Sequence, residues 1–307
     1  MNKKKHVLLL LFTICNVIII PFYSSAESYD EQNNIRVTKS RSAIDIESEI
    51  NTLLNTPDII EEGFVAFATR SYFPILEVLI KSVHAFSTRP IVVFGINDDI
   101  PFSTTKYPHL IKKRIDVNLN EFHIFYQKPR IIAHSGIKYG IYVEADDIVA
   151  PNIDEMFTWC KNVQDYPLCP IHPNNVNVLP DIMQSIGVKN KSMPYVHGHI
   201  VFAPSCKHFI LEWLKACYMY KEVASKQNYD ESILNVLLWK YNAVTYLPPY
   251  DPFCTLYVDY INNKNGNHTI NYCDNNIVPF MFHGAKNIQI AEKILRELIN
   301  YANTKLK

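Results

Sequence analysis

Hydrophobic residues recur along the chain with two periodicities, which predict strands alternating with helices. A continuous apolar run predicts a buried strand over 63–69, and further strands are expected over 90–96, 114–117, 140–145, 195–204 and 278–284. Apolar residues at helical spacing predict helices over 75–83, 128–137, 207–220, 230–241 and 287–301, and a short helix around residues 44–54. This alternation predicts an α/β protein with a mostly parallel central sheet flanked by helices, in a single domain.

Two of the predicted helices carry further detail. In the last helix, one face is predicted to hold the apolar side chains of Ile288, Ala291, Ile294, Leu295 and Leu298. In the helix predicted over 128–137, a proline at position 129 falls in the first turn, where proline is tolerated.

The first 26 residues have the layout of a secretory signal peptide. Lysines at positions 3–5 precede an apolar run over 7–22, and cleavage is expected after Ala26. A membrane anchor is the alternative, although the apolar run is 16 residues long and a spanning helix needs about 20. Residues 27–60 are expected to form a polar stem with the short helix, and residues 61–307 the folded domain.

Either reading of the leader takes the body of the protein across a membrane. The expected location is a secretory lumen (endoplasmic reticulum or Golgi) or the secreted state, and the periplasm or cell exterior in a bacterium. Six cysteines lie outside the leader, an even number that permits three disulfides. The pairs Cys160–Cys169 and Cys254–Cys273 would close the shortest loops. Asn190 begins a glycosylation sequon, as does position 267.

The charge balance bears on partners. The formal net charge is zero, and it becomes about −3 once three leader lysines are removed. Nucleic-acid binding depends on an excess of basic side chains. We therefore expect no nucleic-acid partner, and a membrane partner only if the N-terminal segment is retained as an anchor.

The stretch "GIYVEADDIVAP" (140–151) ends a predicted strand in three carboxylates. Ligands of open α/β sheets bind beyond the carboxyl ends of the strands. Strand alternation would put Glu144 and Asp146 on one side, where two carboxylates suit Mg²⁺ or Mn²⁺ together with substrate phosphates. The implied chemistry is displacement of a diphosphate, whose developing charge the ion neutralises. Alternatively, these acids cap the helix beginning near Pro151 or face solvent.

The segment "YQKPRIIAHSGIKYGIYVEADDIVAPNIDEMF" (126–157) resembles the central part of GT-A-fold glycosyltransferases, particularly the glycogenin-like, family-8 type. Those proteins carry a lysine or arginine before a "YLDADIIV" strand with its metal-binding DXD motif. Here Lys128 lies 16 residues before Glu144. Glu144 replaces the first aspartate of the motif, and its carboxylate reaches one methylene farther. Asp146 matches the second aspartate, and Asp147 is an additional potential ligand.

Two segments resemble the donor and acceptor sides of the same family. "FATRSYFPILEVLIKSV" (67–83) resembles the first strand and helix, whose turn holds the nucleotide, so Thr69, Arg70 and Tyr72 are implied donor contacts. "YVHGHIVFAPS" (195–205) resembles the "FNSGVFV" strand on the acceptor side. His197 stands where that pattern has asparagine, and His199 stands where it has glycine.

Two later segments complete the ordered set. "NYDESILNVLL" (228–238) resembles "DQDILN" through Asp230 and Glu231. "FMFHGAKN" (280–287) resembles the "HFXGXXKPW" ending through His283, Gly284 and Lys286, with a shortened spacing and no Pro-Trp. The resemblance implies that His283 is a third metal ligand and that Lys286 contacts diphosphate.

Each of these residues could also have a purely structural role. Lys128 is alternatively a solvated helix residue, since lysines are mostly exposed, and His283 a satisfied core histidine. His197 and His199 are predicted to point to one face, where packing or hydrogen bonding to an acceptor is favoured over metal binding. Asp230 is alternatively the N-cap of the helix it precedes.

The function implied is that of a metal-dependent glycosyltransferase using a nucleotide-sugar, with a UDP-sugar favoured, and Mn²⁺ or Mg²⁺. The acceptor would be a glycan, protein or lipid. The metal would be held by Glu144, Asp146 and His283, the donor by Thr69, Arg70, Tyr72, Lys128, Gly284 and Lys286, and the sugar or acceptor positioned by Asp230 or Glu231. Two alternatives are a GT-A-like glycan- or nucleotide-binding protein without catalysis and a secreted metal-dependent phosphoesterase, which would need more ligands for a two-metal site.

Overall fold

The structure, a computed structural model, describes residues 43–172, 176–243 and 280–305. The leader, Cys254, Cys273 and Asn267 lie outside the described residues. The central sheet has the order β3-β2-β1-β4-β6. Its strands are β1 (Ile60–Ala68), β2 (Ile91–Ile96), β3 (Leu110–Ile115), β4 (Ile137–Tyr142) and β6 (Ile200–Phe202). All neighbouring strands are parallel except β6, which runs antiparallel to β4. The predicted α/β class with a mostly parallel sheet is confirmed.

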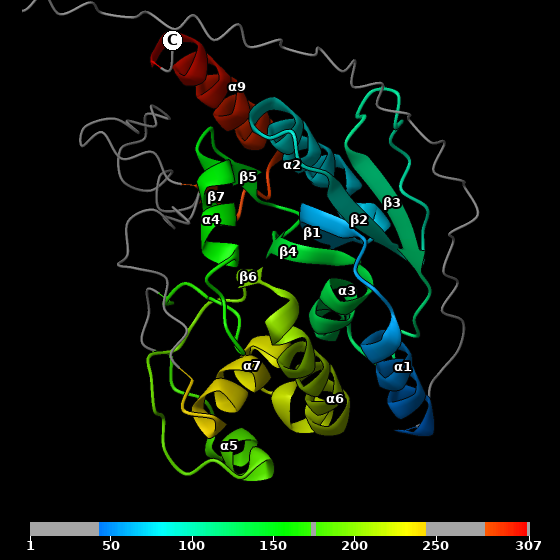
Figure 1. The fold of residues 1–307 in the computed structure, drawn as a ribbon, viewed down its shortest axis with the longest axis vertical. Helices are drawn as coiled ribbons and strands as arrows, with labels where there is room; N and C mark the ends of the chain where they lie inside the picture. Colours follow the sequence, from blue (N-terminus) through cyan, green and yellow to red (C-terminus); the bar gives the residue numbers. More distant parts are fainter. Residues whose placement is uncertain (1–42, 173–175, 244–279, 306–307) are drawn as a thin grey trace, which may run out of the picture. The chain divides into compact units, whose positions relative to one another are not determined.

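Helices cover both faces of this sheet (Figure 1). The α-helices are α1 (Ala43–Asn55), α2 (Phe73–Phe86), α3 (Lys128–His134), α4 (Met156–Cys160), α5 (Pro180–Ile186), α6 (Lys207–Ala224), α7 (Tyr229–Lys240) and α9 (Ile288–Lys305). Within the described ranges, the 3-10 turns are η1 (Arg70–Tyr72), η2 (Ile124–Gln127), η3 (Ile153–Glu155) and η4 (Pro204–Cys206). Helices α2 and α9 pack together on one side, and α3 packs against α6 on the other. None of the helices described is both long and apolar enough to cross a bilayer.

Some strands were easier to predict from the sequence than others. Every residue of β2 is buried, as expected for a parallel strand covered on both faces. Strand β3 was predicted over 114–117 but spans Leu110–Ile115. Its middle carries Lys112, Lys113 and Arg114, charges typical of an edge strand. These charges leave no apolar run that would have marked where the strand begins.

Helix α3 is shorter than predicted. It ends at His134, and Ile137 already begins β4. Gly136 has a φ of +74°, a left-handed conformation that ends helices and suits glycine. Its carbonyl accepts hydrogen bonds from the backbone N–H groups of Ile59 and Ile60, at 2.9 Å each. Pro129 occupies the first turn, as predicted.

The segment predicted as a strand over 195–204 is regular only in β6. The prediction missed that this strand is antiparallel and short. Gly140 of β4 lies opposite Phe202, and a Cβ on Gly140 would lie 2.1 Å from the Phe202 ring. The close approach of β4 and β6 therefore requires glycine at position 140.

A second, two-stranded sheet joins distant parts of the chain. Strand β5 (Ile148–Val149) pairs antiparallel with β7 (Met281–Phe282). β7 falls within the strand predicted over 278–284. Helix α9 follows β7, and its predicted apolar face is buried except for Ile288, which is 40% exposed. Ile288 is the first residue of α9, where the helix has not yet reached the core.

Helix α1 is packed onto the rest of the fold. Ile46 and Leu53 join an apolar cluster with Leu211 and Leu214 of α6. Leu54, which lies within the helix predicted around residues 44–54, is exposed. The buried carboxylate of Glu49 contacts Arg130 Nε and His134 Nε2 of α3, at 3.1 and 2.8 Å.

The cysteines of the described residues are free. Cys160, Cys169, Cys206 and Cys217 are buried thiols, so the short loop between Cys160 and Cys169 is not closed by a disulfide in this structure. Cys160 instead contacts the Gly140 carbonyl, at 3.7 Å, and Cys169 contacts that of Pro167, at 3.9 Å. Burial raises the pKa of the Cys160 and Cys206 thiols to about 12, which keeps both as thiols at neutral pH.

Candidate active site

The acidic segment after β4 forms a tight turn. The strand ends at Tyr142, three residues earlier than predicted. The Glu144 N–H donates to Asp147 Oδ2 at 2.6 Å, and the Asp147 N–H donates to the Glu144 carbonyl at 3.0 Å. The strand-alternation argument for Glu144 and Asp146 is therefore wrong, because neither lies in a strand. The turn itself brings their carboxylates to one place.

His283 reaches this turn through the pairing of β5 with β7. Its Nδ1 atom lies 3.8 Å from Asp146 Oδ1 and 3.9 Å from Glu144 Oε2. Gly284 follows with a φ of +83°, and the Ala285 N–H donates to the Asp146 carbonyl at 3.0 Å. The three residues predicted as metal ligands thus offer ligand atoms within 4.8 Å of one another.

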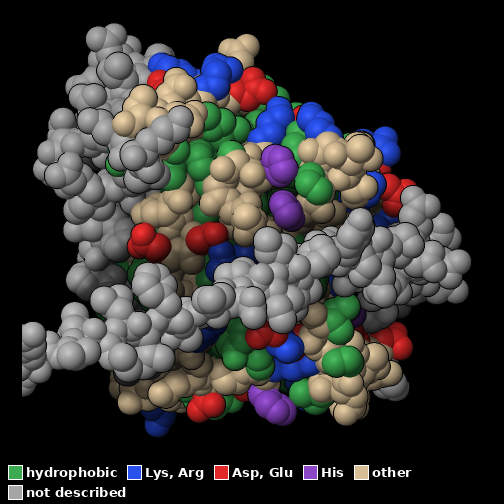
Figure 2. Space-filling view, turned by 45° about the horizontal axis from the view of Figure 1, so that its top comes forward, with side chains coloured by type: hydrophobic (Ala, Val, Ile, Leu, Met, Phe, Trp, Pro, Cys, Tyr) green, Lys and Arg blue, Asp and Glu red, His purple; other side chains and the backbone are tan. Residues whose placement is uncertain are grey.

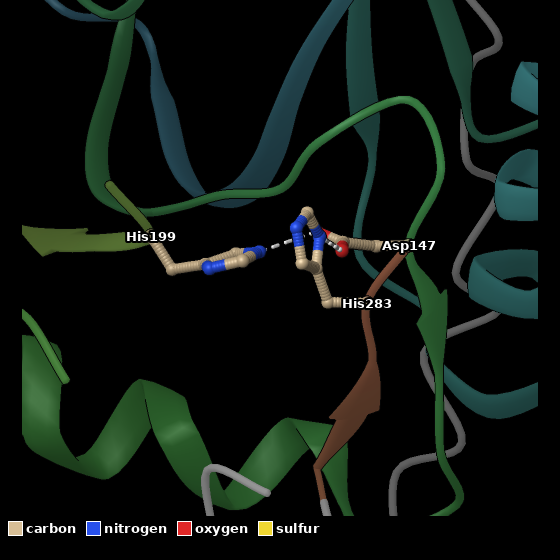
Figure 3. Close-up of side chains that lie close together, drawn as sticks. All are labelled: Asp147, His199 and His283. Carbon is tan, nitrogen blue, oxygen red and sulfur yellow. Dashed lines mark hydrogen bonds and ion pairs between the residues drawn. The ribbon is translucent and has the colours of Figure 1, made fainter. Parts of the chain in front are cut away.

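Asp147 lies at the centre of a second cluster (Figure 3). Its Oδ2 is 2.9 Å from His199 Nε2, and its Oδ1 is 2.9 Å from His283 Nδ1. The Nδ1 atoms of His199 and His197 are 3.1 Å apart, so these histidines do share a face. The His172 ring stacks on that of His197 at 5.4 Å. The sequence analysis missed His172 and the central place of Asp147. The H-x-H pattern of His197 and His199 was the sequence feature that pointed to a histidine cluster here.

Lys128 is buried beside the acidic turn. It is 6% exposed, so the reading as a solvated lysine is wrong. Its Nζ lies 3.0 Å from Glu144 Oε1 and 3.5 Å from Asp230 Oδ2. The same atom lies over the face of the Tyr142 ring. Burial opposes its charge, but the carboxylates of Asp230 and Glu144 outweigh burial and hold the pKa of Lys128 well above its usual value.

Asp230 and Glu231 open helix α7. Asn228 and Tyr229 just before them have positive φ values of 47° and 45°, a strained conformation for non-glycine residues. Asp230 is not the N-cap, since Asn228 occupies that position. Burial raises the pKa of Asp230 to about 7, although Lys128 opposes the shift. Burial also raises the pKa of Glu231.

Gly198 connects these carboxylates to the histidines. Its N–H donates to Glu231 Oε2 at 3.0 Å. A Cβ at this position would lie 2.4 Å from Lys128 Nζ. The His199 side chain contacts Asp147, whereas the backbone at Gly198 leaves room for the Lys128 ammonium group.

The predicted donor contacts lie at the same edge of the sheet. Thr69, Arg70 and Tyr72 follow the carboxyl end of β1, the parallel neighbour of β4. Arg70 and Tyr72 are exposed, and Arg70 pairs with Asp98 at 2.6 Å. Lys286, after the His283 turn, is also exposed. Arg70, Tyr72 and Lys286 are thus exposed, unlike the buried residues of the acidic cluster.

The electrostatics of the acidic turn fit a divalent cation. Burial and the adjacent charge of Asp147 raise the pKa of Asp146, a repulsion that a cation would offset. Burial acts to raise the pKa of Glu144, but Lys128 and the histidines lower it overall. Burial is likewise outweighed at Asp147, whose pKa falls to about 2 beside His199 and His283. Carboxylate oxygens are ligands that suit Mg²⁺ and Mn²⁺.

On the face drawn in Figure 2, basic and acidic side chains of the described residues are interspersed. The formal net charge of the whole sequence is likewise zero.

No protein-family model matches the sequence, and no curated protein matches it. Among solved structures, the chain is similar to the glycosyltransferase GlyE of Streptococcus pneumoniae TIGR4, with a TM-score of 0.49 and 15% identity over 81% of this chain and 64% of that one. It is also similar to the apo form of GlyE, with a TM-score of 0.48 and 13% identity over 80% of this chain and 64% of that one. The chain thus spans just under two thirds of the length of the structures it matches.

Proposed function

We propose that the protein is a metal-dependent glycosyltransferase that uses a nucleotide-sugar donor. One observation carries the proposal: Glu144, Asp146 and His283 converge beyond the end of β4, beside the buried pair of Lys128 and Asp230. The carboxyl end of a parallel sheet is where α/β proteins bind their ligands. The order of motifs along the chain, which resembles that of GT-A-fold glycosyltransferases, supports the same function.

Glu144, Asp146 and His283 would hold Mn²⁺ or Mg²⁺. When bound, such an ion neutralises the charge that develops on a diphosphate leaving group. Lys286, in the turn after His283, would add positive charge near the diphosphate, and Gly284 gives this turn its conformation. Thr69, Arg70 and Tyr72 would contact the nucleotide at the neighbouring end of β1.

The residues behind the metal ligands would orient the sugar. Lys128 keeps Glu144 ionised and holds it in place. Lys128 was expected to contact the donor phosphates. Its ammonium group is instead shared by the carboxylates of Glu144 and Asp230. Asp230, with its pKa raised to about 7, is suited to accept a proton at neutral pH. Glu231 is fixed by the Gly198 N–H and would help to position the sugar or acceptor.

The acceptor is proposed to be a glycan, a protein or a lipid in an extracytoplasmic or secretory compartment. The leader pattern of residues 1–26 supports this compartment. A UDP-sugar is the first donor to test, because the resemblance to the family-8 type favours it.

The test is release of nucleotide from a panel of UDP- and GDP-sugars, with Mn²⁺ and with EDTA. We expect slow, Mn²⁺-dependent release that Asp146→Ala abolishes. Asp181→Ala is the matched control, since that carboxylate is 70% exposed. No release, together with no metal-dependent binding of UDP or GDP, would contradict the proposal. Metal-dependent binding without release would favour the alternative of a binding protein without catalysis.

A further inference from the structure

Three aromatic side chains gather where η2 meets the start of α7: His123, Phe125 and Tyr229. The His123 ring stacks on the Tyr229 ring, with centroids 4.7 Å apart and planes inclined by 12°. The Phe125 ring is tilted against both, at 4.9 Å from His123 and 5.0 Å from Tyr229. We propose that these three rings, the aromatic platform, bind a pyranose ring of a glycan acceptor. This rests on the proposed function and names the acceptor class that it leaves open.

The aromatic platform is partly exposed and is supported by buried rings. Phe125 is 51% exposed, and His123 is exposed as well. Tyr126 is buried and packs against Tyr229, with centroids 5.7 Å apart and planes at 70°. The buried ring of Phe122 in turn stacks on Tyr126 at 5.3 Å. The surface rings are therefore backed by a packed aromatic core, which keeps them in place without a ligand.

The aromatic platform continues directly from the buried pair of Lys128 and Asp230. Helix α7 begins with Tyr229 and Asp230, and η2 ends at Gln127, one residue before Lys128. The Tyr229 ring contacts the rings of the η2 segment, while the Asp230 carboxylate contacts Lys128 at 3.5 Å. Two consecutive residues of α7 thus lie along one continuous segment. They join a partly exposed aromatic surface to the proposed proton acceptor, Asp230.

The backbone at the start of α7 is strained beside the platform. Asn228 and Tyr229 have φ values of 47° and 45°, which residues other than glycine seldom adopt. Such strain persists where the surrounding contacts impose it, and it is common at ligand-binding sites. Here it accompanies the packing of the Tyr229 ring against His123 and Phe125, as expected if the position of that ring matters for binding.

A sugar ring matches the chemistry and the size of the aromatic platform. The face of an aromatic ring carries partial negative charge, and one face of a pyranose presents C–H groups with partial positive charge. Three partly exposed aromatic side chains offer on the order of 300 Å² of surface, whereas a stable protein interface covers about 800 Å² on each partner. The exposed residues Glu121 and Asn228 adjoin the platform in the chain and can hydrogen-bond to sugar hydroxyl groups.

A nucleobase is the competing ligand, because bases also stack on exposed aromatic side chains. The position of Asp230 favours the acceptor. A group that accepts a proton from the attacking hydroxyl must lie within hydrogen-bond reach of it, so the acceptor has to approach Asp230. The proposed nucleotide contacts Thr69, Arg70 and Tyr72 follow β1 instead.

The test measures glycan binding without donor or metal. Chitotetraose, cellotetraose, mannotetraose and lacto-N-tetraose are titrated into the protein in EDTA and followed by calorimetry. At least one should bind, and Phe125→Ala should weaken that binding by about 10-fold, the scale of one lost stacked ring. Phe125→Tyr, which keeps a ring, should bind as the wild type does. The matched control is Tyr241→Ala, because Tyr241 is 38% exposed and caps the far end of α7, about 18 Å along the helix.

A second measurement needs no variant. Saturation-transfer NMR with irradiation of the aromatic protons should transfer magnetisation to the C–H protons of one sugar residue more strongly than to the rest of the bound tetrasaccharide. This readout decides the proposal even if Phe125→Ala does not fold. Uniform transfer to all four sugar residues would contradict stacking on one ring.

The outcomes also separate the aromatic platform from the proposed function. No binding of any of the four tetrasaccharides, unchanged affinity in folded Phe125→Ala, or an equal loss in Tyr241→Ala would each overturn the platform. Weaker binding of UDP in Mn²⁺ by Phe125→Ala, with glycan binding unchanged, would assign the rings to a nucleobase and overturn it too. So would a dimer that Phe125→Ala dissociates. Platform-dependent glycan binding without nucleotide release would contradict only the transferase, and nucleotide release without glycan binding would contradict only the platform.

Discussion

The ammonium nitrogen of Lys128 lies 3.0 Å from Oε1 of Glu144. The first residue of α3 is thereby joined to the turn that follows β4. Asp230, from the start of α7, lies on the same ammonium group at 3.5 Å. One buried positive charge thus serves two carboxylates from different segments, so the cluster is sensitive to the loss of Lys128.

Replacing Lys128 by methionine should destabilise the protein strongly. The substitution leaves Glu144 and Asp230 without their buried partner, and breaking a buried ion pair on one side typically costs about 3–5 kcal/mol. Urea unfolding at neutral pH measures the loss. Lys240→Met is the matched control, because Lys240 pairs with Glu212 at the surface and such pairs contribute at most about 1 kcal/mol. A Lys128→Met loss no larger than that of the control would contradict this account.

Substituting Gly198 with alanine should displace Lys128 while leaving the fold largely intact. The added Cβ would lie 2.4 Å from Lys128 Nζ, so the flexible end of that side chain must move away from Glu144. We expect metal-dependent nucleotide release to fall by about 100-fold, the scale of a misplacement near 1 Å. Release rates and urea unfolding should be measured together. In a Lys128→Met background the alanine should have little further effect, and a full additional loss there would count against the mechanism.

Manganese should stabilise the folded protein through the acidic turn. A ligand that binds only the native state at about 100 times its Kd adds roughly 2.7 kcal/mol. Unfolding followed with saturating Mn²⁺ and then with EDTA should show this difference in the wild type. Asp146→Asn should remove it, whereas Asp181→Asn should retain it. An equal Mn²⁺ effect in wild type and Asp146→Asn would place the ion elsewhere.

The stability of the metal-free protein should fall in alkaline solution because of His283. Its contact with Asp147 raises the pKa of His283 from 6.5 to about 9, against the effect of burial. A pKa raised on folding contributes stability that is complete below 6.5 and is lost as the pH rises through about 9. The loss due to this group should be about 3 kcal/mol. Urea unfolding in EDTA across this range, compared with His283→Gln, isolates it, and parallel curves for the two proteins would refute it.

Local sequence was enough to predict most of the regular structure. The apolar runs of β1 and β2 and the helical spacing of α2, α6 and α7 are local signals, and these elements appear where they were expected. Predictions failed at boundaries decided by neighbouring segments. The strand before Glu144 ends early because the turn closes on Asp147, and α3 ends early because Gly136 turns the chain into β4.

The sequence by itself determined which chemical groups are present at the edge of the sheet. The run of carboxylates after β4, the H-x-H alternation and the single His283 were all visible, and the residues predicted as metal ligands do come together. Only the tertiary structure decided which groups touch. Asp147 and His283 are 136 residues apart and meet because β5 pairs with β7, and Lys128 is buried because Gly198 leaves space for it. Such contacts arise from pairing between distant segments, which no local pattern of residues encodes.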